Sequence, residues 1–137
     1  MERSQIVTMV SRKLVPYILL FGLYLISYGH LSPGGGFQGG VVLASGIILL
    51  FLSHGFTLVQ RRFSERQLSL TVLVMVFLFL LLGLAGLILG KSFLSNILLL
   101  GEAGEIPSAG FILLLDMIIG LNVGAGITLI CFYLFRA

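Results

Sequence analysis

Four long apolar runs, separated by short polar or glycine-rich stretches, dominate the pattern of this chain. A helix that crosses the ~30 Å hydrocarbon core of a bilayer needs about 20 predominantly apolar residues, and each run approaches or exceeds that length. The pattern therefore predicts an all-α membrane protein with four transmembrane helices in a single integral membrane domain, residues 1–137. The expected spans are residues 10–29, 37–59, 68–90 and 108–135.

The first connection is the stretch His30-Leu31-Ser32-Pro33-Gly34-Gly35-Gly36-Phe37-Gln38-Gly39-Gly40. Proline fixes its own φ and disfavours helix at the residue before it, and glycine tolerates positive φ. We predict that the first helix ends near Gly29, that the chain turns sharply, and that the second helix begins near Phe37.

The other connections carry different signals. Gln60–Gln67 reads as a polar loop between the second and third spans. Lys91–Pro107 is longer, and its apolar residues recur at helical spacing, which favours a short interfacial helix. These residues are Phe93, Leu94, Ile97 and Leu98.

Composition supports the membrane assignment and charge sets its orientation. The chain is 58% hydrophobic and 9% charged, whereas a soluble domain carries about 25% charged residues. The small net charge of +3 lies at the ends of the spans and so indicates topology, not a nucleic-acid partner. Lys91 alone lies on the side opposite Arg3, Arg12, Lys13, Arg61, Arg62, Arg66 and Arg136. The positive-inside rule then places both termini in the cytoplasm and the glycine-rich stretch outside.

Asp116 is the one acid inside an apolar run. An ionised carboxylate within a membrane is costly, so this one should meet a partner charge, line a water-filled cavity or stay protonated. Gly120 and Gly124 follow at i+4 and i+8 and give its helix face two small residues, which suits close contact with another helix. We take Asp116 as an ion-path candidate, with a structural interhelical hydrogen bond as the alternative.

Other polar residues offer weaker chemistry. His30, at the end of the first span, is a second ion-path candidate because imidazole can relay protons, or it bonds the carbonyls that the helix end leaves free. Asn122 lies on a different face from Asp116 and is expected to bond a neighbouring helix. The letters of a dinucleotide-binding motif occur at Gly34, Gly36 and Gly39, but a membrane helix replaces the strand that should precede them. We expect no enzyme activity, cofactor or metal site in this chain.

Small residues and tyrosines mark candidate packing faces. Gly36, Gly40 and Ala44 share one helix face, and so do Gly86 and Gly90, a spacing that lets a second helix approach closely. We interpret these faces as surfaces for packing against other subunits. Tyrosines are candidates for interfacial or interhelical contacts at three positions of the first span, Tyr17, Tyr24 and Tyr28.

The stretch from Gly29 to Gly40, followed by Ala44 and Ser45, closely resembles the signature of the MnhB/MrpB subunit family. These proteins are small membrane subunits of Mrp-type multi-subunit sodium/proton antiporters, with relatives in membrane-bound hydrogenases and kindred respiratory complexes. The resemblance implies a non-catalytic subunit of a prokaryotic cell (inner) membrane that supports Na⁺ and H⁺ movement with other membrane subunits. With the small residues that follow Asp116 added, we take as the structural and subunit-packing motif Pro33, Gly34, Gly35, Gly36, Phe37, Gly39, Gly40, Gly120 and Gly124.

Two alternatives remain open at this point. One is a purely structural assembly subunit of a membrane-bound hydrogenase-like complex. The other is a self-sufficient four-helix exporter, which the absence of an acid from the first span disfavours.

Overall fold

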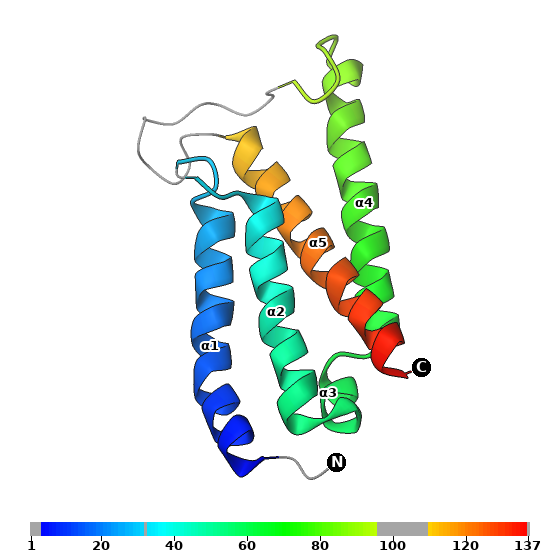
Figure 1. Cartoon of the computed structure of the whole chain (residues 1–137). Helices are drawn as coiled ribbons and strands as arrows, with labels where there is room; N and C mark the ends of the chain where they lie inside the picture. The colour runs from blue at the N-terminus through cyan, green and yellow to red at the C-terminus, as the bar shows by residue number, and fades with distance from the viewer. Residues whose placement is uncertain (1–3, 32, 96–109, 137) are drawn as a thin grey trace.

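The computed structural model describes residues 4–31, 33–95 and 110–136, and these residues form a bundle of helices (Figure 1). Four helices are long and apolar enough to cross a membrane, which confirms the predicted all-α fold with four spans. They are α1 (Gln5–Ser27), α2 (Gly36–His54), α4 (Glu65–Ile88) and α5 (Phe111–Arg136). A short helix, α3 (Phe56–Arg62), lies between α2 and α4.

Helix α2 lies between α1 and α5, and α4 packs against the other side of α5 (Figure 1). Because α4 touches little besides α5, most of its surface is open, and from Val72 to Ile88 that surface is apolar. Leu73, for example, is 67% exposed. A helix stretch that is apolar on every face suits a lipid environment.

The turn between α1 and α2 forms where the glycine-rich stretch predicted it. Helix α1 ends at Ser27, and the backbone N–H of Tyr28 closes the last turn onto the Tyr24 carbonyl at 2.9 Å. Gly34 and Gly35 then adopt φ values of 147° and 133°, a region that side chains strongly disfavour. Helix α2 begins at Gly36, directly after this pair, because two such residues reverse the chain without a longer loop.

The second predicted span divides at Gly55, so the expected helix to residue 59 is wrong. Helix α2 ends at His54, and Gly55 takes a φ of 88°. This corner lets α3 fold back, so that Phe56 stacks on Phe51 and on Phe132 of α5 with ring centroids 5.9 and 4.8 Å apart. Hydropathy alone predicts one continuous span through this corner. The packing of these rings holds the short helix in place.

Helix α4 begins sharply after α3 because its first turn is capped. The Ser64 hydroxyl accepts a hydrogen bond from the Gln67 backbone N–H at 3.3 Å, and the Gln67 side chain accepts one from the Ser64 N–H at 3.2 Å. Glu65 next to this cap accepts hydrogen bonds from Tyr133 and Arg136 of α5, at 2.6 and 3.1 Å. The cap and these contacts fasten the start of α4 to the end of α5.

At the other end of α4 the chain folds back onto its own glycines. A side chain at Gly83 would overlap the ring of Phe93, and one at Gly86 would lie 2.6 Å from the Ser92 carbonyl oxygen. The interfacial helix expected in residues 91–107 lies mostly outside the described residues. Its described beginning is a turn with Leu94 at a φ of 58°, so Gly83 and Gly86 accommodate this chain's own reversal.

Candidate functional site

The glycines that begin α2 serve two neighbouring helices. A side chain at Gly36 would overlap the backbone carbonyl of Asp116, and one at Gly40 would overlap that of Gly120, so both residues face α5. Gly39 points the other way, and a side chain there would lie 2.8 Å from the Gly22 carbonyl oxygen of α1. The glycine-rich stretch is therefore the point where three helices meet closely.

The small-residue face of α5 meets the small-residue face of α2 within this one chain. Gly36 and Gly40 lie against the stretch of α5 from Asp116 to Gly124, with both helices running in the same direction (Figure 1). The expectation that these glycines pack against other subunits is wrong for this face. They bring α2 and α5 of the same chain together. The predicted match of the Asp116 face with a second helix is found, and that helix is α2.

Asp116 lies where the turn, α2 and α5 converge. Its Oδ1 accepts a hydrogen bond of 3.4 Å from the backbone N–H of Gly36, the first residue of α2. The N-cap residue Gly35 offers no side chain to the free N–H groups of that helix end, so the carboxylate of another helix occupies the capping position. The positive end of the α2 dipole stabilises a negative charge at this point.

The second carboxylate oxygen is differently placed. Asp116 Oδ2 approaches the α1–α2 turn so closely that a side chain at Gly29 would lie 2.9 Å from it. Among the described residues Oδ2 has no hydrogen-bond partner, and the side chain as a whole is half-buried. One oxygen thus holds the helix end and the other is left to accept water or a cation.

Asp116 lies closer to the start of its helix than the expected span 108–135 puts it. Helix α5 begins at Phe111 in the described residues, which puts Asp116 five positions in, about 8 Å at 1.5 Å per residue. It is level with the first residue of α2, at the end of the bundle where the glycine-rich turn lies (Figure 1). The acid therefore lies near one end of the bundle and not at the middle of its length.

His30 belongs to the same turn but not to the Asp116 contact. Both ring nitrogens are buried, and neither has a hydrogen-bond partner among the described residues. The expectation that His30 bonds the carbonyls freed at the end of α1 is therefore wrong. Within the described part of the chain no hydrogen bond joins His30 to Asp116. The two ion-path candidates therefore lie at the same end of the bundle, one in the turn and one on α5, without being paired.

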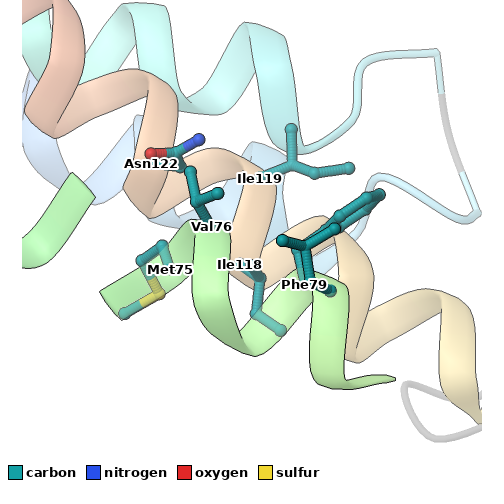
Figure 2. A pocket seen from close by; sticks show the side chains of 7 residues that line it. Met75, Val76, Phe79, Ile118, Ile119 and Asn122 are labelled. Carbon is teal, nitrogen blue, oxygen red and sulfur yellow. The ribbon is translucent and has the colours of Figure 1, made fainter. Parts of the chain in front are cut away.

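Asn122 lies six positions beyond Asp116 on α5, on the face toward α4. Figure 2 shows it beside a cavity of about 230 Å³ between the two helices, otherwise lined by apolar side chains. Asn122 Oδ1 is buried and has no hydrogen-bond partner among the described residues, so the expected bond to a neighbouring helix is not made. The cavity is lined by Met75, Val76, Phe79, Leu80, Ile118, Ile119 and Asn122.

The remaining residues of the predicted motif point outward or shape the turn. Phe37 and Pro33 are exposed, whereas Gly34 and Gly35 supply the backbone reversal. Sequence reasoning missed that Gly29 belongs to the site, because its role is to leave room for the Asp116 carboxylate. The sequence does carry a signal for the pairing of α2 with α5. It is the equal four-residue spacing of Gly36 with Gly40 and of Asp116 with Gly120.

The fold and this site define a multi-pass membrane protein with a carboxylate held at a helix N-terminus by a glycine-rich turn. Residues 6–129 match the family model described as a domain related to the MnhB subunit of Na⁺/H⁺ antiporter. Because that match covers most of the chain, this protein belongs to the MnhB family.

Individual relatives are of two kinds. The uncharacterized protein MJ1307 of Methanocaldococcus jannaschii is 30% identical over 97% of this chain and 53% of its own length. A putative antiporter subunit mnhB2 of Staphylococcus aureus is 46% identical over 54 residues, 39% of this chain and 38% of the relative. The chain thus spans about half or less of these relatives.

A solved structure supports the fold independently. A chain of the membrane-bound sulfane sulfur reductase, an archaeal respiratory membrane complex, superposes with a TM-score of 0.81 and 30% sequence identity. The match covers 96% of this chain and 58% of that one. Family and fold thus agree on a multi-pass membrane protein of the MnhB family.

Proposed function

We propose that this chain is a non-catalytic subunit of an Mrp-type sodium/proton antiporter module, and that Asp116 lines the cation path at its outer mouth. The observation that carries the proposal is the different placement of the two carboxylate oxygens of Asp116. Oδ1 caps α2 through Gly36, while Oδ2 has no hydrogen-bond partner among the described residues. A fixed negative charge with one unengaged oxygen attracts a cation without needing to move.

The path must be shared with neighbouring subunits. Beyond Asp116 the contact between α2 and α5 is closed by glycine backbone, since a side chain at Gly40 would lie 3.0 Å from Val123 and 3.1 Å from the Gly124 nitrogen. Such a contact leaves no room for a hydrated ion between the two helices. Cation passage therefore requires a surface of this chain that faces another subunit.

Exchange in the intact complex tests the role of Asp116. Asp116→Asn keeps an oxygen that can cap Gly36 but removes the charge, so we expect assembly to be unchanged and sodium-dependent proton exchange to fall about tenfold or more. The measurement is exchange in vesicles that contain the purified complex, normalised to the amount of this subunit. Full exchange by a normally assembled Asp116→Asn complex would contradict the proposed path.

The second candidate is a purely structural subunit of a respiratory complex, which the match to the sulfane sulfur reductase complex favours. In that case the Gly36 hydrogen bond is the whole role of Asp116. Asp116→Asn then leaves every activity of the complex intact, whereas Asp116→Leu, which cannot cap α2, lowers assembly. Comparing the two substitutions separates charge from capping.

The orientation belongs to the same proposal. The start of α1, the short helix α3 and the end of α5 lie at one end of the bundle, and the glycine-rich turn lies at the other (Figure 1). We expect tags on both termini to be accessible only from the cytoplasmic side of spheroplasts and inverted vesicles. A terminal tag that proteases remove from intact spheroplasts would reverse the assignment of Asp116 to the outer side.

A further inference from the structure

Helix α1 carries an exposed face that differs chemically from the lipid-facing surface of α4. Its inner face packs on α2 through Val15, Gly22 and Ile26, which are buried. The opposite face repeats at the alternating intervals of three and four residues that mark a helix-packing seam. The seam residues are Val10, Lys13, Tyr17, Leu20, Tyr24 and Ser27.

Tyr17 lies near the middle of the bundle along the length of its helices. Its neighbour Ile18 packs against Gly46, near the centre of α2, as a side chain at Gly46 would lie 3.3 Å from Ile18. At 1.5 Å per residue, Gly46 is about 12 to 15 Å from either end of α2, farther than a tyrosine side chain extends. The Tyr17 hydroxyl therefore lies between the levels of the two ends of α2 and reaches neither.

The Tyr17 hydroxyl is unsatisfied within the described chain. The side chain is 71% exposed, and its oxygen bonds no described residue. Helical hydroxyls elsewhere in the bundle bond their own backbone, as Thr71 does to the Gln67 carbonyl at 2.9 Å and Thr128 to the Gly124 carbonyl at 2.7 Å. A tyrosine ring holds its hydroxyl too far from its own helix to do the same. Exposing such a group to hydrocarbon costs several kcal/mol.

The seam has further features that lipid does not explain. The rings of Phe21, Tyr24 and Tyr28 stack along it, with centroid separations of 6.2 and 4.9 Å. Together with Tyr17 they line a shallow, open depression on this face of α1. Lys13 stands at the next seam position toward the N-terminus, exposed and without an ion pair among the described residues.

We propose that this face of α1 is the docking seam for a transmembrane helix of a neighbouring subunit, which offers a hydrogen-bond acceptor opposite Tyr17 and an acidic group opposite Lys13. An acceptor opposite Tyr17 satisfies the hydroxyl. An acid offsets the cost of Lys13, which lies five positions along α1 from Thr8, whose hydroxyl bonds the Ser53 carbonyl near the end of α2 at 3.2 Å. The inference rests on the proposed function for the existence of other subunits but not on the role of Asp116. The α4 surface, which carries Leu73 and Phe77, remains the lipid-facing side.

Site-specific photo-crosslinking in the intact complex tests the seam. A benzophenone amino acid is placed at Tyr17 or Tyr24, and at Phe77 of α4 as the matched control, before irradiation of native membranes. We expect Tyr17 and Tyr24 to give adducts with another subunit and Phe77 to give lipid adducts. Lipid adducts alone at Tyr17, while the other subunits still co-purify, would overturn the inference, and so would an adduct with a second copy of this chain.

A second measurement tests the hydrogen bond. Tyr17→Phe removes only the hydroxyl, and we expect it to lower the fraction of partner subunit retained under detergent challenge about three- to tenfold, with Phe77→Leu without effect. Equal retention by the Tyr17→Phe complex would overturn the acceptor opposite Tyr17. Because the crosslink is expected to persist in Asp116→Asn, failure of the seam and failure of the cation path give different results.

Discussion

Gly40→Ala is expected to reduce the assembled complex about tenfold or more, although it adds a single methyl group. The new Cβ would overlap the Gly120 carbonyl and lie 3.0 Å from the Val123 side chain. Backbone atoms cannot move aside as a flexible side chain can, so α2 and α5 must separate along the contact that also positions Asp116. Overpacking of this kind costs about 1–3 kcal/mol, and 1.4 kcal/mol is a factor of ten in an equilibrium. The measurement is the amount of the complex recovered in mild detergent at equal expression.

Gly126→Ala is the matched control for this prediction. Gly126 lies within the partner helix α5, but a side chain there would have nothing within 4 Å. Alanine is the better helix former, so this variant should assemble normally or slightly better. If Gly40→Ala assembled as well as Gly126→Ala, the close α2–α5 contact would not exist in the membrane.

The features that hydropathy and backbone chemistry control were predictable. Long apolar runs specify four spans, and the Pro33–Gly36 stretch specifies where α1 and α2 are joined, because few other sequences tolerate successive positive φ values. The pairing of α2 with α5 was half predictable. The spacing of Gly36 with Gly40 and of Asp116 with Gly120 predicts two compatible helix faces. Nothing in the pattern indicates that the two faces meet within one chain.

The features that depend on tertiary contact escaped prediction. Gly55 looks like any glycine in an apolar run, and only the packing of Phe56 on Phe132 makes it a corner. Gly29 became part of the Asp116 site through the space it leaves, which no local pattern records. His30 and Asn122 were expected to find partners because buried polar groups usually do, yet none is present among the described residues. If the proposed complex exists, such groups are where a single chain is least complete.

Phe132→Ala is expected to cause the largest loss of stability at the end of the bundle opposite Asp116. Phe132 is 0% exposed and lies against Phe51 and Phe56, with ring centroids 6.2 and 4.8 Å away. Removing a buried phenylalanine ring costs about 3–5 kcal/mol, and the cavity would release α3 from the bundle. The measurement is the thermal unfolding midpoint of the purified complex, together with the rate at which protease cleaves within α3. Phe135→Ala, at a ring that is 46% exposed, should change both far less.

The same variant separates stability from transport. Phe132 is sixteen positions beyond Asp116 on α5, which at 1.5 Å per residue is about 24 Å. A loosened α3 end should therefore leave the Asp116 carboxylate hydrogen-bonded to the Gly36 N–H, and exchange per assembled complex should stay near that of the unmodified protein. If exchange per complex instead fell as far as in Asp116→Asn, the α3 end would belong to the transport path. The carboxylate at the glycine-rich turn would then be one part of a site that extends through the whole bundle.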